Sequence, residues 1–303
     1  MAKAAKILLT GASGQVGAEL LPLLRELGEV VAPDRAALNL EDTQSVRAAV
    51  RDVAPLWIVN PAAYTAVDLA ESEPDRAYAV NRDAVRVLGE EAARLGAGVL
   101  HFSTDYVFDG TAGHAYREQD ATAPANVYGA SKLAGEQALA ASGAAHIILR
   151  TSWVYGATGK NFLRTILRLA RQREVLRVVA DQTGAPTWSR DLARLTAHVL
   201  RQVTPLTLGS RGGVYHAAGR GETTWCGFAA EGVRLLQERE PEARLARIEP
   251  ITTAEYPTPA RRPANSRLDG TRLAREFGWQ MMDWHDSLRI VMGELAEQGA
   301  GEG

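Results

Sequence analysis

The sequence predicts an α/β protein whose first half folds into a doubly wound parallel sheet. Short, continuously apolar segments alternate there with longer segments of helical periodicity, and a glycine-rich turn follows the first apolar segment. Continuously apolar strands are typical of sheets covered on both faces, and their alternation with helices favours parallel pairing with right-handed crossovers. The turn lies where such sheets bind a phosphate group.

The individual elements follow from the same patterns. In the first half we predict strands over residues 6–10, 30–32, 56–60, 98–103 and 146–150. Between them we predict helices over residues 16–27, 43–53, 75–95 and 128–141. Beyond residue 150 the alternation is less regular, with helices predicted over 161–172, 190–202, 225–238 and from 284, and strands over 175–179 and 213–219.

This change of pattern predicts two interleaved domains. The first takes residues 1–150 together with roughly 174–218, and we expect it to bind a dinucleotide. The second is a smaller α/β domain of residues 219–303 together with roughly 151–173, and we expect it to bind the substrate.

Composition excludes several classes of function. The net charge of -2 in 303 residues provides no bulk attraction to nucleic acid or to an anionic membrane. No apolar run approaches the roughly 20 residues that span a bilayer, so we expect neither a membrane nor a nucleic-acid partner. The single cysteine, Cys226, cannot form an intrachain disulfide, which favours a cytoplasmic location.

The glycine-rich turn reads "TGASGQVG" and places Gly11, Gly14 and Gly17 between the first strand and the first helix. Glycine lets the backbone approach a pyrophosphate, which binds at the positive end of the helix. The spacing is GxxGxxG and departs from the GxGxxG of dehydrogenases. After the second strand, Asp34 could accept hydrogen bonds from an adenosine ribose, whereas Arg35 could bind the 2′-phosphate of NADPH. Both cofactors stay open.

Polar and small residues follow the third and fourth strands. Ala62 and Ala63 would let a dinucleotide lie against the backbone. Ser103 and Thr104 end the fourth strand, where a hydroxyl can hydrogen-bond a carbonyl oxygen. The next helix begins with Tyr128 and Lys132, which helical spacing places on one face. The tyrosine and lysine content predicts about 0.1 chance Tyr-xxx-Lys matches in the whole chain.

The glycine turn, the strand-end hydroxyls and the Tyr-xxx-Lys pair converge on one edge of the sheet. In this combination the chain resembles the extended short-chain dehydrogenase/reductase family, whose fold is the NAD(P)-binding Rossmann fold. The resemblance implies that Tyr128 is the general acid/base and that Thr104 holds the substrate oxygen. It also implies that Lys132 binds the nicotinamide ribose and lowers the pKa of the tyrosine. Asn81 resembles the family's supporting helix asparagine.

The resemblance implies NADPH or NADH as cofactor. The residues expected to bind it are Gly11, Ser13, Gly14, Gln15, Val16, Gly17, Asp34, Arg35, Asn39, Leu40, Ala62, Ala63, Tyr64, Phe102, Tyr128 and Lys132.

Further segments narrow the resemblance, among them "AAYTAVDLAESEP", "STDYVFDG", "NVYGASKLAGE", "RTSWVYG", "DQTGAPT" and "YPTPARRPANSRLD". They resemble the members of the family that reduce the 4-keto group of a nucleotide sugar, dTDP-4-dehydro-L-rhamnose. The residues expected to bind this substrate are Thr65, Thr104, Asp105, Tyr128, Trp153, Arg261 and Arg262. Trp153 would pack on the sugar, and the two arginines would face the diphosphate. The resemblance implies a monomer or a homodimer.

Three features depart from the family pattern. Pro61 and Tyr64 change the segment after the third strand, which would alter the nicotinamide pocket. Some members form a dimer bridged by magnesium through glutamates, and Glu19, Glu294 and Glu297 could match these positions. Arg190 stands where another glutamate is expected, so we predict that no metal binds there.

Two alternative functions remain at this point. The first is a nucleotide-sugar epimerase or dehydratase with the same fold, although the Asp-Glu pair that a dehydratase needs after Thr104 is replaced by Asp105 and Tyr106. The second is a non-catalytic NADP-binding regulatory subunit, like that of methionine adenosyltransferase. Intact Tyr128, Lys132 and Thr104 favour the reductase over the regulatory subunit, whereas tightly bound NAD in the purified protein would reveal an epimerase.

Overall fold

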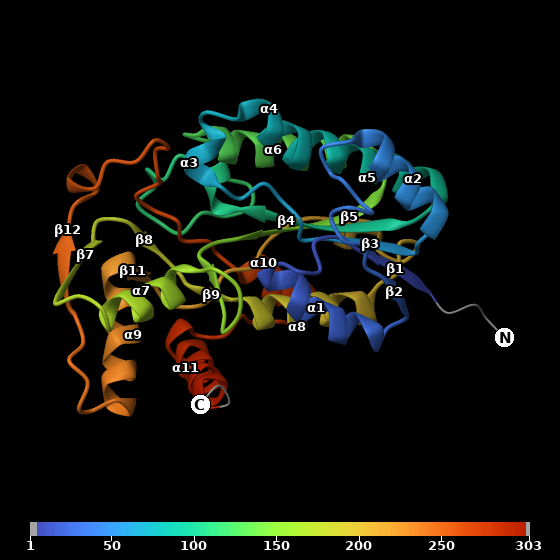
Figure 1. The fold of residues 1–303 in the computed structure, drawn as a ribbon. Coiled ribbons are helices and arrows are strands. Elements are labelled where there is room, and N and C mark those ends of the chain that lie inside the picture. The colour runs from blue at the N-terminus through green and yellow to red at the C-terminus, as the bar shows by residue number, and fades with distance from the viewer. Residues whose placement is uncertain (1–4, 301–303) are drawn as a thin grey trace.

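The computed structural model describes residues 5–300 and confirms the predicted α/β class (Figure 1). Its main sheet has six strands in the order β10-β5-β4-β3-β1-β2, and every pair in it is parallel. The strands of this sheet are β1 (Lys6–Leu9), β2 (Glu29–Val31), β3 (Trp57–Asn60), β4 (Gly98–Thr104), β5 (Ala145–Thr151) and β10 (Gly213–His216).

Helices cover both faces of the sheet, as Figure 1 shows. The helices packed on it are α1 (Gln15–Arg25), α2 (Thr43–Val53), α5 (Ala84–Leu95), α6 (Val127–Ala141), α8 (Ser189–Gln202) and α10 (Thr271–Phe277). Alternate strand residues face opposite layers: Leu9 lies in a core with α1 and α8, whereas Leu8 lies in a core with α2 and α5. Continuous burial of the strands therefore reflects two separate apolar cores.

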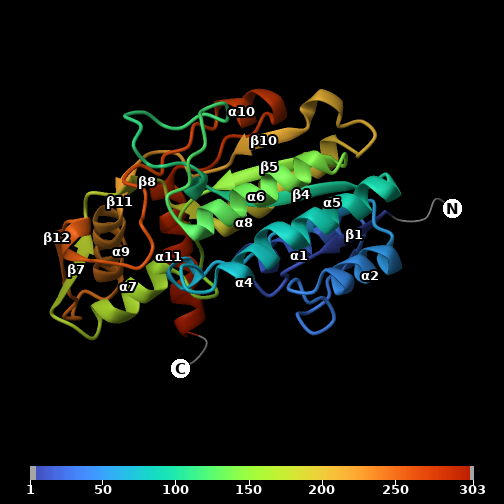
Figure 2. The ribbon, with the colours of Figure 1, turned by 90° about the horizontal axis from the view of Figure 1, so that it is seen from above.

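A second lobe lies beside the sheet's carboxyl edge. Its short strands are β6 (Val154–Tyr155), β7 (Val175–Val179), β8 (Thr183–Gly184), β9 (Thr187–Trp188), β11 (Thr223–Thr224) and β12 (Arg247–Ile251). Its helices are α7 (Phe162–Ala170), α9 (Trp225–Arg239) and α11 (Trp284–Ala300). Figure 2 shows α7 and α9 together in this lobe, and they pack around two apolar cores of their own.

The allocation of residues to the two lobes differs from the sequence prediction at two points. We predicted that β7 belongs to the dinucleotide domain, but it pairs with β12 in the second lobe. We predicted that residues 219–303 belong to the substrate domain, but Leu273 and Phe277 of α10 pack in the core of the main sheet. Both differences arise because partners far apart in sequence decide where each element packs. The two-domain division itself stays a proposal.

The helix predicted over residues 75–95 is interrupted. It consists of α4 (Pro74–Tyr78), one π-helical turn η1 (Ala79–Asp83) and then α5. The turn contains Asn81, and single π turns of this kind often lie at functional sites. The remaining short elements are α3 (Val67–Ala70) and the 3₁₀ turns η2 (Asp105–Val107), η3 (Gly209–Arg211) and η4 (Thr253–Glu255). No helix in the described part of the chain has the length and apolar content that crossing a membrane requires.

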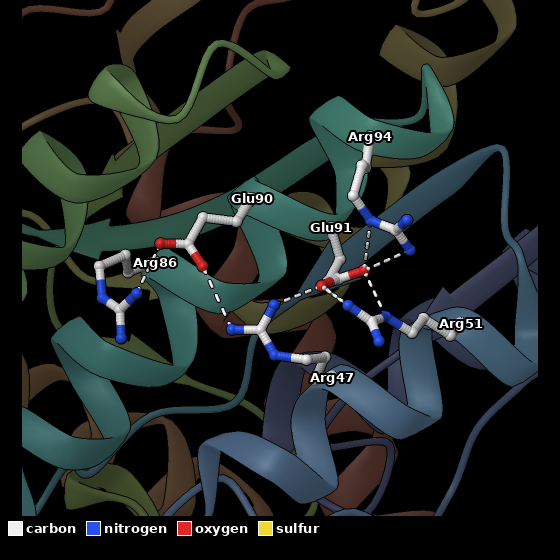
Figure 3. A network of polar contacts seen from close by, with 6 residues as sticks. All are labelled: Arg47, Arg51, Arg86, Glu90, Glu91 and Arg94. Carbon is white, nitrogen blue, oxygen red and sulfur yellow. Dashed lines mark hydrogen bonds and ion pairs between the residues drawn. The ribbon is translucent and has the colours of Figure 1, made fainter.

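A network of charges joins α2 to α5 (Figure 3). The Glu91 carboxylate is 1% exposed and accepts hydrogen bonds from Arg51 at 2.9 Å, Arg47 at 2.5 Å and Arg94 at 3.0 Å. The hydrogen bond from Arg51 is the largest of several effects that lower the pKa of Glu91 to about 2. The network therefore stabilises the fold only while Glu91 is ionised.

Glu91→Gln is expected to lower the free energy of unfolding by about 1–3 kcal/mol, because three guanidinium groups lose their shared counter-charge. The folded-state pKa lies below the unfolded value, so the stabilisation is complete above the unfolded value and is lost as pH falls towards about 2. Urea denaturation at pH 7 and pH 3 measures both effects. Glu90→Gln is the matched control, because Glu90 also pairs with Arg47 but is 38% exposed. Equal losses in the two variants would contradict the prediction.

Candidate functional site

The carboxyl ends of the parallel strands form a continuous groove. The strand order reverses between β1 and β3, which is where ligands bind in open sheets of this kind. Two adjoining cavities, of about 470 and 370 Å³, lie along this edge and share Gly11, Ser13, Ala62, Ala63 and Thr65 as lining residues. All sixteen residues predicted to bind the cofactor line one cavity or both.

The glycine turn is shaped for an anion. Gly11 has a φ of 58°, and a Cβ atom on Gly17 would lie 2.0 Å from the Gly11 carbonyl oxygen, so this close packing requires glycine. Helix α1 begins after Gly14 without a side-chain cap and has no acidic residue in its first turn. Its first N–H groups and positive helix end are thus available to a pyrophosphate, and the turn fits the predicted dinucleotide.

Charged side chains surround the far end of the larger cavity. The Asp34 carboxylate accepts hydrogen bonds from the backbone N–H groups of Ala36 and Ala37. Arg35 is mostly exposed and pairs with Glu41 at 2.8 Å, and Glu41 also pairs with Arg76 at 2.9 Å. Two guanidinium groups therefore flank one carboxylate at this rim, next to Asp34.

The segment after β3 is held from below by the π turn. The Asn81 side chain accepts a hydrogen bond from the Tyr64 N–H and donates to the Tyr64 carbonyl oxygen and to the Ser131 hydroxyl on α6. The Tyr64 hydroxyl donates to Glu73 at 2.9 Å. Tyr64 thus lies in the wall of the larger cavity, and the predicted supporting role of Asn81 has a direct geometric basis.

Lys132 lies beneath the smaller cavity and is 2% exposed. Its Nζ donates to the Phe102 carbonyl oxygen at 2.6 Å and lies 3.1 Å from Nε2 of His101. Burial lowers the pKa of Lys132 to about 8, and the charge of Glu136 opposes this shift. Lys132 is therefore fixed on the side towards β4.

Tyr128 lines the same cavity and has Thr104 beside its hydroxyl. Burial raises the pKa of Tyr128 to about 12, the Thr104 hydrogen bond lowers it, and the charge of Asp105 raises it. Lys132 does not contribute to this shift, because its ammonium is bound to β4; the lowering of the Tyr128 pKa by Lys132 stays a prediction from the resemblance. Tyr128 is consequently protonated at neutral pH, as a proton donor must be.

Thr104 and Asp105 form a buried pair at the end of β4. The Thr104 hydroxyl donates to Asp105 Oδ1 at 3.0 Å and accepts a hydrogen bond from the Tyr106 N–H. Burial raises the pKa of Asp105 to about 6. The pair fixes the position of the Thr104 oxygen next to Tyr128.

Two other predicted substrate residues, Thr65 and Trp153, lie in different places, and only Trp153 lies towards the second lobe. Thr65 lines both cofactor cavities. Trp153 has a φ of 47°, which is strained for a side chain of this size, and stacks on Trp225 with ring centroids 3.7 Å apart. Trp225 in turn lines a cavity of about 660 Å³ between α7, β7 and the 256–262 segment. The aromatic stack therefore adjoins a space large enough for part of a ligand.

The two predicted diphosphate-binding arginines differ in their surroundings. Arg262 lines the cavity of about 660 Å³ but pairs with Asp68 of α3 through two hydrogen bonds of 2.9 and 2.8 Å. The Arg262 guanidinium therefore joins the 256–262 segment to α3 and is not free to bind a phosphate. Arg261 has an exposed side chain, and its carbonyl oxygen accepts a hydrogen bond from Asn126 at 2.7 Å.

Comparisons with known proteins show which family the chain belongs to. Residues 5–297 match the family model described as RmlD substrate binding domain. A dTDP-4-dehydrorhamnose reductase of Burkholderia thailandensis is 48% identical over 299 residues, covering 97% of this chain and 100% of the relative.

The chain belongs to the dTDP-4-dehydrorhamnose reductase family.

Two solved structures of this family are also similar. The enzyme of Clostridium acetobutylicum is 35% identical with a TM-score of 0.88, and the alignment covers 96% of this chain and 99% of that one. The enzyme of Bacillus anthracis, solved in complex with NADP, is 34% identical with a TM-score of 0.85 and the same coverage. The resemblance predicted from the sequence is thereby confirmed.

At the positions where the sequence predicts that no metal binds, the structure places an ion-paired cluster. The Arg190 guanidinium donates to Glu19 at 2.8 Å and also pairs with Glu294. The arginine thus supplies the positive charge between these two carboxylates. Such a donor set does not fit magnesium, which needs oxygen ligands and no cation beside them. Within residues 5–300, no group of three acidic, histidine or cysteine side chains could hold a metal ion.

Sequence reasoning missed several residues that the structure brings to the site of this family member. They are His101 and Asn60 beneath Lys132, Asp68 opposite Arg262, Trp225 against Trp153, and Asn126 at the start of α6. Asn126 could have been found as a helix-capping residue just before Tyr128. The others carry no local signal, because each acts through a partner from a distant segment.

Proposed function

We propose that this chain reduces the 4-keto group of dTDP-4-dehydro-L-rhamnose to give dTDP-L-rhamnose, with NADPH or NADH as the cofactor. The observation that carries the proposal is the position of Tyr128 and Lys132 in the lining of the cavity formed by the glycine turn, with the buried Thr104 beside the Tyr128 hydroxyl. The family membership supports the same reaction.

The bound dinucleotide supplies a hydride to C4 of the sugar. Tyr128 donates its proton to the C4 oxygen as negative charge develops there, and its raised pKa keeps that proton available. The Tyr106 N–H positions the Thr104 oxygen, and the Thr104 hydrogen, which is donated to Asp105 in this structure, would turn to the C4 oxygen when the substrate binds. Lys132 provides a buried positive charge near the reacting atoms.

The nucleotide part of the substrate would extend from this cavity into the second lobe. Trp153 and Trp225 present one stacked aromatic unit there. Arg261 is exposed on the segment that borders this region, and we propose that it contacts the diphosphate. Arg262 acts by holding that segment through Asp68. The oligomeric state, monomer or homodimer, and the cytoplasmic location stay predictions of the sequence.

The preference for NADPH over NADH is expected to depend on Arg35, which lies at the edge of the larger cavity. Arg35→Ala should lower kcat/KM for NADPH about tenfold, because one guanidinium partner for the 2′-phosphate is lost. The NADH value should change much less, since NADH has no such phosphate. Glu41→Gln should favour NADPH, because Arg35 and Arg76 no longer share their charge with a carboxylate. Steady-state kinetics with both cofactors measure these effects, and an equal loss for NADH in Arg35→Ala would contradict the assignment.

The proposed function is tested by following NADPH and NADH oxidation with dTDP-4-dehydro-L-rhamnose generated in situ. Oxidation coupled to formation of dTDP-L-rhamnose supports the reductase. Cofactor binding without oxidation would overturn it and favour the regulatory subunit. Tightly bound NAD in the purified protein, together with interconversion of nucleotide sugars without net oxidation, would favour an epimerase.

A further inference from the structure

A buried chain of polar side chains crosses the sheet directly below the two cofactor cavities. Thr10 Oγ1 lies 2.5 Å from Asn60 Oδ1, Asn60 Nδ2 lies 2.9 Å from His101 Nδ1, and His101 Nε2 lies 3.1 Å from Lys132 Nζ. None of the four residues is more than 2% exposed. The proposed reaction uses only Lys132, so the histidine in the middle of the chain has no assigned role.

When Lys132 is charged, the donors and acceptors around His101 determine which of its ring nitrogens carries a proton. An ammonium group has only hydrogens to offer, so the atom facing it must present a lone pair. Nε2 of His101 must therefore be unprotonated. The ring is neutral, because burial and the charge of Lys132 hold the pKa of His101 well below its usual value. Its single proton must then be on Nδ1.

The proton on Nδ1 determines the direction of the hydrogen bonds at Asn60 and Thr10. Nδ1–H has to donate to the side-chain oxygen of Asn60, so the amide nitrogen of Asn60 faces Thr10. In the structure the Asn60 nitrogen faces His101 and its oxygen faces Thr10, so this arrangement requires the amide group to be rotated by 180°. The two orientations of an amide group have nearly the same shape. The Thr10 hydroxyl then accepts from Asn60, and its own hydrogen is free to point towards the cavity that Thr10 lines.

A neutral Lys132 would reverse every donor in the chain. Its nitrogen could accept from Nε2–H, Asn60 would donate to Nδ1, and Thr10 would donate to the Asn60 oxygen. The two arrangements are mutually exclusive, because each contact in the chain needs one hydrogen and one lone pair, so reversing one contact reverses the next. The other charges near Lys132, Glu136 on α6 and Arg150 on β5, are paired with each other at 2.6 Å. His101 is therefore the side chain in direct contact with the ammonium group.

We infer that His101 is a positioning residue that holds the Lys132 ammonium through Nε2, in the Nδ1–H tautomer that this ammonium imposes and that a turned Asn60 amide accepts. The tautomer follows from the contact between Nε2 and a charged Lys132, together with the turned Asn60 amide, whereas its effect on turnover rests on the proposed function. His101 touches neither cofactor nor substrate in this scheme and acts only through Lys132.

Turnover tests the effect on Lys132. His101→Phe keeps an aromatic ring but removes the nitrogen that accepts the hydrogen bond from Lys132. The loss of one such hydrogen bond should lower kcat/KM about 10–100-fold. The alkaline limb of the pH profile, which is the fall of kcat/KM at high pH, should move to lower pH. His101→Gln offers Oε1 to Lys132 and should restore most of the limb. His146→Phe is the matched control, because this β5 histidine bonds the Ala144 carbonyl oxygen instead, and it should leave the limb unchanged. An unchanged limb in His101→Phe, or no rescue by glutamine, would overturn the inference.

Nitrogen NMR of the histidine rings tests the tautomer without any turnover. In the wild-type protein at pH 7, His101 should show a protonated Nδ1 and an unprotonated Nε2, and Lys132→Met should remove this preference. Loss of the signal in His101→Gln identifies the residue. A protonated Nε2 in the wild type would overturn the inference even in a protein that reduces the nucleotide sugar. The predicted tautomer in a protein without reductase activity would leave the inference standing and overturn the proposed function.

Discussion

Tyr128→Phe is expected to lower kcat about 10²–10⁴-fold, which is the usual contribution of a positioned proton donor. The variant loses one hydroxyl and keeps the ring, so the edge-on contact with Tyr106, with centroids 5.6 Å apart, should persist. Dissociation constants for NADPH should stay close to the wild-type value. Single-turnover kinetics together with fluorescence titration of the cofactor separate the two quantities.

The pH profile should assign the ionisations to particular residues. Burial raises the pKa of Tyr128 to about 12, so the proton donor remains protonated over the accessible range. Burial lowers the pKa of Lys132 to about 8, so its charge is present below that pH and is lost above it. We therefore expect kcat/KM to fall above about pH 8, with Lys132 as the cause. Lys132→Met should remove this limb.

Tyr106→Phe is the control for the tyrosine. Burial also raises the pKa of Tyr106, but this residue lies within η2 and is not among the residues that line the cavity at Tyr128. It should retain most of the activity. Comparable kcat losses in the two variants, or an active Tyr128→Phe enzyme, would show that the proton comes from elsewhere.

Glu136→Gln is expected to lower the free energy of unfolding by about 3–5 kcal/mol, because it leaves the charge of Arg150 buried without a partner. Both side chains are 5% exposed, and two hydrogen bonds of 2.9 and 2.6 Å join them. Arg150 also stacks on Phe108 and has one buried Nη1 without a partner, so it cannot easily turn towards solvent. Urea denaturation at pH 7 measures the loss.

The double variant Glu136→Leu/Arg150→Met distinguishes the cost of an unpaired charge from the loss of a favourable pair. Two apolar side chains of similar length should recover most of the stability, because replacing a complete buried pair is often neutral. Glu136 also raises the pKa of Lys132, so Glu136→Gln should shift the alkaline limb of activity to lower pH. A loss in the double variant as large as in Glu136→Gln would contradict this explanation.

Much of the fold could be predicted because it depends on local patterns. Helix α2 and strand β7 begin and end at the predicted residues, and the glycine turn lies where its spacing placed it. The π turn at Asn81 was not predictable, because it leaves the apolar periodicity of the long helical segment almost unchanged. The short paired strands of the second lobe were missed for a different reason: two residues are too few to show a period.

The candidate site divides in the same way. Tyr128 and the glycine turn line one cavity, and Thr104 ends β4 at the same edge, because the order of these elements along the chain already brings them together. The partner of Arg262 was not predictable, since Asp68 is 194 residues away and either arginine could have faced a phosphate. His101 lies in the middle of a strand, where a buried histidine has no pattern that separates a structural role from a functional one.

Asn126 has a consequence for how the two lobes depend on each other. Its Oδ1 caps α6 by accepting from the Gly129 N–H at 2.7 Å, while its Nδ2 holds the Arg261 carbonyl oxygen at 2.7 Å. One side chain thus joins the loop that carries Arg261 to the helix that carries Tyr128. If Arg261 contacts the diphosphate as proposed, we expect a change in this loop to affect both nucleotide affinity and turnover rate. A redesign of the loop for another nucleotide should therefore preserve the Arg261 backbone carbonyl.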